Sequence, residues 1–348
     1  MKKVFFRTTF IVSFTLIVLS LIFSGCGRPF INMEGVELSK IEKVTRDTIE
    51  EEKDIKLTPE GSLAIGSFVR FGEYQVESEE SNPILWKVIE NKSHYKGNVN
   101  PDAKHMTLLA ENIIDLRGFD AKEPQSKLEF VIEYGNSRYI FSNLRQWFNS
   151  SKKANSWWEP QYEADAKPDD EGFESITAKG YPTGYEDKDG FLNSFSPEEL
   201  GLLLDTTVEC GINKTDGGRT ETVTDKVFLL SLAEVGLGEK EGKNYLEGNP
   251  FVIFNSPESR LAYLSTQCFK NTKSIQVPTD NTKESWEWWL RSPYSWDEYD
   301  VWATDSNGIE MYRRAYKGAF GLRPALNIKY EGLTYSGSGT IDDPYIIK

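Results

Sequence analysis

Apolar and polar side chains alternate along several short segments of the chain, and other short segments are almost wholly apolar. Both patterns are typical of β-strands, with one buried face in the first case and two in the second. Strands are predicted at residues 67–74, 84–90, 105–110, 226–231, 286–291, 301–304, 309–312 and 321–328. Asp305-Ser306-Asn307-Gly308 is expected to form a hairpin turn. Residues 336–347 are expected to form a flexible piece that ends in a short last strand.

One segment carries its apolar side chains at helical spacing. Residues 143–149 place Leu144, Trp147 and Phe148 at positions i, i+3 and i+4, which lie on one face of a helix. The sequence therefore predicts a short helix there, with these three side chains facing the core.

Capping signals predict two further helices. Ser196, Pro197 and Glu199 form a capping box, and a similar start is expected for a helix over 255–264. Residues 215–225 contain Asp-Gly-Gly and predict a turn, while residues 150–190 predict a long surface excursion. Short strands, few helices and long loops indicate an α+β fold.

The N-terminus has the pattern of an export signal. Three basic residues precede an uncharged apolar stretch that ends at Ser24-Gly25-Cys26. Phe23-Ser24-Gly25-Cys26 resembles the bacterial lipobox, which implies cleavage after residue 25 and a diacylglycerol lipid on Cys26. The expected location is the outer face of a cell membrane, held by that lipid. The alternative is an uncleaved transmembrane helix, since about 18 apolar residues can span a bilayer.

Composition divides the rest of the chain. Residues 26–60 are expected to be the lipidated cysteine and a polar tether, residues 61–330 the folded domain, and residues 331–348 a tail strand. Without the three basic residues of the signal, 37 basic residues face 54 acidic ones, a net charge of −17. Because an acidic surface repels nucleic acid and anionic headgroups, neither is an expected partner.

Histidine and cysteine are scarce. The chain has only two histidines, His94 and His105, and this scarcity argues against His-zinc sites and Ser-His or Cys-His catalysis. Besides Cys26 the chain has only Cys210 and Cys268, which could form a disulfide or remain buried thiols. Their spacing fits no metal motif, so no metal and no cofactor is expected.

Six ordered segments resemble a family of bacterial extracytoplasmic domains of unknown function. The resemblance covers roughly residues 61–330 and implies no established activity. The segments are Phe71-Gly72-Glu73-Tyr74-Gln75, Pro83-Ile84-Leu85-Trp86-Lys87-Val88, Ser142-Asn143-Leu144-Arg145-Gln146-Trp147-Phe148-Asn149, Thr224-Asp225-Lys226-Val227-Phe228-Leu229-Leu230-Ser231, Trp289-Leu290-Arg291-Ser292-Pro293 and Gly321-Leu322-Arg323-Pro324-Ala325-Leu326.

The last part of the chain is more distantly similar to the C-type lectin-like fold in its formylglycine-generating-enzyme form. Trp289-Leu290-Arg291 and Gly321-Leu322-Arg323 would occupy the places of a Trp- and Arg-bearing strand and a closing Gly-x-Arg strand. That enzyme uses a cysteine pair near the end of its domain, and no cysteine follows Cys268 here. Oxidase activity is therefore not expected, and the calcium and sugar motifs of true C-type lectins are also absent.

Three charged residues of these segments are candidates for ordering a site. Arg291 and Arg323 are expected to be buried ion-pair partners or, as the alternative, to bind a ligand. Asp225 is expected to hold a turn or to pair with one of these two arginines. Trp289 and Leu290 are expected in the core.

A loop that follows Pro293 mixes aromatic rings with acids, a combination that suits sugar rings or cationic peptides. The candidate binding residues are Trp296, Asp297, Tyr299, Asp300 and Trp302, with Trp157 and Trp158 as additions. The sequence thus predicts recognition of a cell-envelope glycan, a peptide or another protein. Two alternatives remain, an envelope hydrolase that uses Asp297 or Asp300 as acid and base, and a structural component of a surface complex. If the tryptophans instead pack over the core, no binding surface is expected from them.

Overall fold

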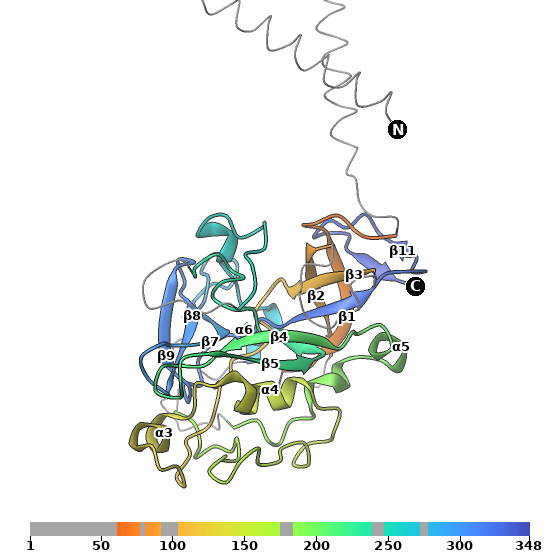
Figure 1. Ribbon diagram of the computed structural model, residues 1–348. Helices are drawn as coiled ribbons and strands as arrows, with labels where there is room; N and C mark the ends of the chain where they lie inside the picture. Colours follow the sequence, from red (N-terminus) through yellow and green to blue (C-terminus); the bar gives the residue numbers. More distant parts are fainter. Residues whose placement is uncertain (1–60, 77–80, 92–103, 175–183, 239–246, 272–277) are drawn as a thin grey trace, which may run out of the picture. The chain divides into compact units, whose positions relative to one another are not determined.

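The computed structural model describes residues 61–76, 81–91, 104–174, 184–238, 247–271 and 278–348 (Figure 1). The predictions for the signal peptide, Cys26, the tether and His94 lie outside these residues. The described chain is a mixed α/β structure that consists mostly of strands, with a few short helices and long irregular connections.

The largest sheet has seven strands in the order β11-β12-β1-β2-β3-β10-β6. All neighbours are antiparallel except β1 and β12, which run parallel. The strands are β1 (Phe68–Tyr74), β2 (Asn82–Glu90), β3 (His105–Ala110), β6 (Val227–Phe228), β10 (Ala325–Lys329), β11 (Tyr335–Ser336) and β12 (Tyr345–Ile347). Residues 331–348, predicted as a separate tail, thus extend this sheet through β11 and β12.

Two smaller sheets complete the strands. One pairs β4 (Thr206–Gly211) with β5 (Thr220–Asp225), and the other has the order β7-β8-β9. The latter strands are β7 (Trp288–Pro293), β8 (Asp300–Thr304) and β9 (Glu310–Arg314). In the view of Figure 1, β7, β8 and β9 lie at the left, β1, β2 and β3 at the right, and β4 and β5 between them.

The helices are short and mostly follow local signals. They are α3 (Glu129–Tyr134), α4 (Asn143–Phe148), α5 (Pro197–Leu200), α6 (Thr266–Asn271) and the 3-10 turns η1 (Tyr139–Phe141), η2 (Phe191–Ser194) and η3 (Glu258–Arg260). α4 buries Leu144, Trp147 and Phe148, as their spacing predicts. α5 has the predicted capping box between Ser196 and Glu199.

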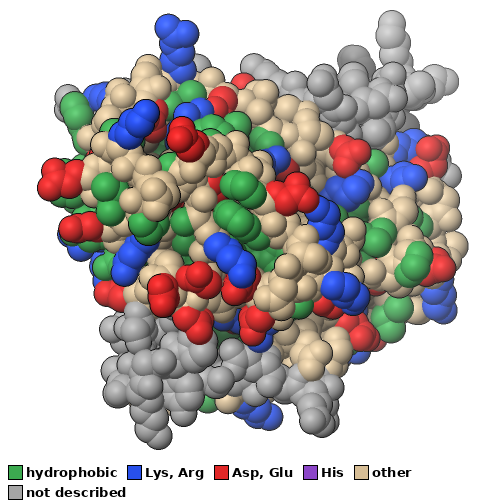
Figure 2. All heavy atoms as spheres, turned by 90° about the horizontal axis from the view of Figure 1, so that it is seen from below, with side chains coloured by type: hydrophobic (Ala, Val, Ile, Leu, Met, Phe, Trp, Pro, Cys, Tyr) green, Lys and Arg blue, Asp and Glu red, His purple; other side chains and the backbone are tan. Residues whose placement is uncertain are grey.

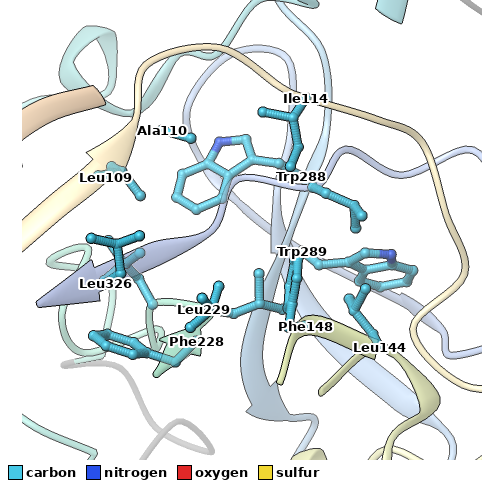
Figure 3. Close-up of a cluster of buried hydrophobic side chains, with 14 of the residues drawn as sticks. Leu109, Ala110, Ile114, Leu144, Phe148, Phe228, Leu229, Trp288, Trp289 and Leu326 are labelled. Carbon is cyan, nitrogen blue, oxygen red and sulfur yellow. The ribbon is translucent and has the colours of Figure 1, made fainter. Parts of the chain in front are cut away.

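The segments that carry the family resemblance meet in one hydrophobic core (Figure 3). Trp289 stacks on Phe320 with ring centroids 4.3 Å apart and packs edge-on against Phe119. In Figure 3, Leu144 and Phe148 of α4 lie beside Trp289, and Phe228 of β6, Leu229 and Leu326 of β10 belong to the same core. Trp289 and Leu290 are fully buried, in agreement with the expectation from the sequence.

Four predicted elements differ from the structure. Residues 220–225 form strand β5 instead of a turn, because they pair along their whole length with β4. Residues 255–264 contain only η3, since Leu261 adopts extended backbone and Arg260 is held by the Gly308 carbonyl at 2.7 Å. Within 226–231 only two residues pair as a strand, and within 321–328 the strand begins at Ala325.

Candidate functional site

Arg291 lies in a fully buried ion pair. Its two terminal nitrogens donate to the Glu234 carboxylate at 2.6 and 2.8 Å, and its remaining donors reach the carbonyls of Glu209, Leu229 and Glu247 at 2.8–3.0 Å. All five N–H groups of the guanidinium are therefore used inside the protein. The contacts of Arg291 are those of a core-ordering residue, the first of the two alternatives raised by the sequence.

Arg323 is also buried, but its charge has a weaker partner. Its Nε donates to the Ala110 carbonyl at 2.9 Å, its guanidinium lies 5.0 Å from the Trp288 ring centroid, and Nη2 is 3.9 Å from the Glu111 carboxylate. Burial lowers the pKa of Arg323, as expected for a guanidinium with little compensating charge. The contacts of Arg323 join β3, β7 and the segment before β10.

Asp225 pairs with an arginine that the sequence analysis did not single out. The Arg145 guanidinium of α4 donates from Nε and Nη2 to both Asp225 oxygens at 2.8–3.1 Å, and from Nη1 to the Ile140 carbonyl at 2.9 Å. The predicted partners were Arg291 and Arg323. The pair instead connects α4 to the end of β5, two segments that lie 80 residues apart.

The tryptophans of the 150–190 excursion point inward. Trp157 is 2% exposed and stacks on Tyr185 with ring centroids 5.8 Å apart. Trp158 is half-buried and packs against the hydrophobic core. Neither indole presents an open face to solvent.

The two tryptophans near β8 differ from each other. Trp302 is buried and packs edge-on against Tyr294 and Tyr312. Trp296 is 59% exposed, and the Lys214 ammonium lies 3.2 Å from its ring centroid. Trp296 alone among the predicted tryptophans is thus broadly accessible to a partner.

Tyr299 belongs to a cluster of four rings at the surface, the α3 aromatic surface, which consists of Phe130, Tyr134, Tyr299 and Tyr316. The Phe130–Tyr299, Tyr134–Tyr299 and Tyr134–Tyr316 centroids lie 5.3–5.6 Å apart. Phe130 is 47% exposed and the three tyrosines are half-buried. These rings therefore form a platform that both solvent and a ligand can reach.

The α3 helix creates this platform by its spacing. Phe130 and Tyr134 lie four residues apart and stack with nearly parallel rings, while Val131 faces the interior. Gly135 ends the helix at φ 76°, and its N–H bonds to the Val131 carbonyl. The i, i+4 aromatic pair in residues 129–134 is the signal that could have identified this helix from the sequence.

Cations border the platform. The Arg314 guanidinium of β9 lies 3.8 Å from the Tyr134 ring centroid, and Lys122 and Lys317 lie 5.2 and 5.6 Å from that of Tyr316. Such contacts contribute roughly 0.5–1 kcal/mol each at exposed sites. These cations hold the rings of Tyr134 and Tyr316 in place, and the rings of Phe130 and Tyr299 remain available for contact with a ligand.

Asp297 and Asp300 form a hydrogen-bonded carboxyl pair beside Tyr299. Oδ1 of Asp297 also accepts from the backbone N–H groups of Tyr299 and Asp300 at 3.3 and 2.8 Å, so this side chain shapes the loop. Burial and the nearby Asp297 charge raise the pKa of Asp300 to about 7, although Arg314 opposes this shift. Asp300 is therefore about half protonated near neutral pH.

A hollow lies beside α4. It has a volume of about 240 Å³ and is lined by Arg145, Gln146, Asn149, Ser150, Lys152, Trp157, Glu159 and Gln161. Most of its polar groups are already paired. Gln146, for example, exchanges two hydrogen bonds of 2.7 Å with the backbone of Glu159.

On the face drawn in Figure 2, acidic and basic side chains are interspersed with small groups of hydrophobic ones.

The chain matches the family described as Domain of unknown function (DUF6273) over residues 104–330. This chain belongs to the DUF6273 family. No curated protein and no solved structure matches it. The DUF6273 region contains α3, α4 and strands β3 to β10, and hence every ring of the α3 aromatic surface. Of the six segments quoted from the sequence, those at 71–75 and 83–88 lie before the match, although their strands share its large sheet.

Metal sites, disulfides and membrane-spanning helices are further features to consider in the described part of the chain. No group of three or more His, Cys, Asp or Glu side chains there could hold a metal ion. Cys210 and Cys268 are both free and buried, which answers the question of a disulfide between them. Among these residues no helix is long and apolar enough to cross a membrane.

Proposed function

We propose that this protein is a lipid-anchored, extracytoplasmic recognition domain that binds a cell-envelope glycan through the α3 aromatic surface. The observation that carries this proposal is the contact between the exposed Phe130 ring and the half-buried Tyr299 ring, outside the hydrophobic core. Aromatic faces stack against the apolar faces of sugar rings, and neighbouring polar groups bond to sugar hydroxyls. The half-buried Asp297 provides such a polar group, and Asp300 lies buried beside it.

The geometry of the carboxyl pair favours binding over hydrolysis. Glycosidases hold their two catalytic carboxyl groups about 5 Å or more apart, so that a sugar or a water fits between them. Asp297 and Asp300 bond to each other instead, and Asp297 is occupied by two backbone N–H groups. This arrangement suits a pair that orders the loop and accepts hydrogen bonds from a ligand.

The proposed location of the protein depends on its N-terminal sequence. The basic residues, the apolar stretch and Ser24-Gly25-Cys26 support export, cleavage after Gly25 and lipidation of Cys26. Two acyl chains give stable anchoring, at about 0.8 kcal/mol per buried methylene. Mass spectrometry of the mature N-terminus tests this location and the lipid modification. A diacylglyceryl-modified Cys26 is expected, and an intact Met1 or an unmodified Cys26 would overturn it.

We also propose that the fold is of C-type lectin-like type. The two segments that suggest this likeness lie side by side. The Trp289 N–H donates to the Gly321 carbonyl at 3.1 Å, and Trp288 and Gly321 form a parallel bridge. An experimental structure that superposes on a C-type lectin-like domain over β7 to β10 would support the assignment, and a different strand order there would refute it.

A binding experiment tests the function. The full-length protein, purified in detergent, is titrated with purified envelope polysaccharides. A Phe130→Ala, Tyr299→Ala double variant is expected to bind at least about fivefold more weakly, because each ring contact contributes about 0.5–1.5 kcal/mol.

Ile341→Ala, which truncates a 55% exposed aliphatic side chain outside the surface, provides the control and is expected to bind like wild type. Wild-type protein that binds none of the polysaccharides, or a double variant that keeps full affinity, would refute the proposal.

A further inference from the structure

The sheet β7-β8-β9 has an outer face that continues the α3 aromatic surface. Asp300 pairs with Arg314 and Trp302 with Tyr312 across β8 and β9. Because side chains alternate along a strand, these four side chains lie on the same face of the sheet. Val301 and Ala303, which alternate with them on β8, are fully buried and face the core.

A second group of rings, the β9 aromatic cluster, occupies this face and consists of Tyr294, Trp302 and Tyr312. Tyr294 and Tyr312 stack with centroids 4.2 Å apart, and Trp302 packs edge-on against both. Tyr312 is 44% exposed and covers the buried Trp302. The outermost ring of the cluster is thus accessible, and it rests on a rigid base.

Asp300 and Arg314, which are partners in the register of β8 and β9, separate the two groups of rings; Arg314 is exposed and Asp300 is buried. Tyr312 and Arg314 are two residues apart on β9, which corresponds to about 7 Å along the strand. Arg314 in turn reaches over Tyr134 of the α3 aromatic surface. A single sugar ring is too short to stack on Tyr312 and on the α3 rings at once.

Charges of both signs balance along this path. Asp300 lies opposite Arg314 on this face, and the Asp297 side chain lies beside Asp300, so charges of both signs meet between the rings. A polyanion or a polycation would meet like charges in such a place. Hydroxyl groups, which both donate and accept hydrogen bonds, match a carboxyl and a guanidinium equally well.

We propose that the ligand is an uncharged, linear oligosaccharide that covers both ring groups, with a central sugar at the Asp300–Arg314 pair. This inference rests on the proposed glycan recognition and adds the shape and charge of the ligand. It assigns Tyr312 to one end of the bound chain and Phe130 and Tyr299 to the other.

A chain-length series tests the inference. A polysaccharide that binds the full-length protein is partially hydrolysed, and fragments of one to six sugars are titrated separately. Affinity is expected to rise at least tenfold between the disaccharide and the tetrasaccharide. Tyr312→Ala should abolish this gain and leave disaccharide affinity within twofold of wild type. Tyr312→Phe, which keeps the ring, should retain the gain, and thermal melting checks that both variants fold.

The outcomes separate the two proposals. If the polysaccharide binds but affinity does not depend on length, or if Tyr312→Ala binds every fragment like wild type, the extended site is refuted while glycan recognition stands. If affinity falls steeply with added salt, the ligand is recognised by charge and the uncharged class is wrong. If no glycan binds at all, the proposed function fails and this inference fails with it.

Discussion

At the residue scale, we expect the buried Arg291–Glu234 ion pair to contribute strongly to the free energy of unfolding. Arg291→Met leaves the Glu234 carboxylate buried without its partner, since both side chains are at most 1% exposed. Removing one member of a buried pair costs about 3–5 kcal/mol. Chemical denaturation of the variant measures this loss in the free energy of unfolding.

The same substitution at the exposed Arg219 is the matched control and is expected to change stability by less than about 0.5 kcal/mol. An Arg291→Met variant within 1 kcal/mol of wild type would show that the pair adds little to folding.

Residue types were easier to predict from the sequence than their partners. Burial of Trp289 and Leu290 follows from their apolar side chains. The partners of Arg291 and Asp225 lie 57 and 80 residues away along the chain, so no local spacing reveals them. Tyr299 was a candidate because its loop is rich in aromatic rings and acids, whereas Phe130 and Tyr316 join it only through the folded structure.

At the scale of elements, the hairpin between β8 and β9 depends on Gly308. This residue has φ 73°, and a Cβ added there would lie 1.9 Å from the Pro257 carbonyl oxygen. Gly308→Ala therefore combines an unfavourable backbone conformation, at roughly 1–2 kcal/mol, with a steric clash. We expect a clear drop in thermal stability and weaker binding of long oligosaccharides, because β9 carries Tyr312.

Gly332→Ala separates the two effects. Gly332 has a similar φ of 80°, but nothing lies within 4 Å of its added Cβ. This variant should lose only the conformational term, so its melting temperature should be higher than that of Gly308→Ala. Equal melting temperatures would show that the Pro257 contact relaxes freely.

Elements with strong local signals were predicted well. α4 and α5 have their apolar spacing or capping box within one turn, and the Asp305–Gly308 turn joins β8 and β9 as expected. β5 has polar and exposed positions that resemble a loop, and only pairing with β4 makes it a strand. Residues 255–264 show the reverse, since helix-like capping residues there are overridden by the contacts of Arg260.

At the scale of the whole molecule, buried carboxyl groups predict how stability varies with pH. Burial raises the pKa of Glu123 and Glu247 to about 7 and that of Asp165 to about 6. In the unfolded chain these groups titrate near pH 4. Folding therefore favours their protonated forms, and the stabilisation present below about pH 4 is lost as pH rises towards 7. The melting temperature should fall between pH 5 and pH 7.5.

Glu123→Gln should flatten this fall, because the variant has no proton to lose at that position. Glu159→Gln is the control, since Glu159 is exposed and its ion pair with Lys152 lowers its pKa, away from this range. A melting temperature that rises from pH 5 to pH 7.5 would contradict the assignment of these carboxyl groups.

The mixed α/β class of the molecule followed from short strands and long loops, but the strand order did not. β10 lies between β3 and β6, and its partner positions are separated by more than 200 residues in the first case. Hydrophobic periodicity indicates that a strand is buried, but it does not indicate which strand lies beside it. The three sheets therefore became visible only in the structure.

The parallel pairing of β12 with β1 has a consequence for biosynthesis. A ribosome makes β1 and β2 early, yet the outer edge of β1 has no neighbour until residues 345–347 emerge. An open strand edge promotes aggregation, so a chain in this condition needs protection by a chaperone or by delayed folding. Closure of the sheet joins segments more than 270 residues apart, and such distant contacts slow folding. We therefore expect this domain to acquire its native structure only after nearly all of it has been synthesised.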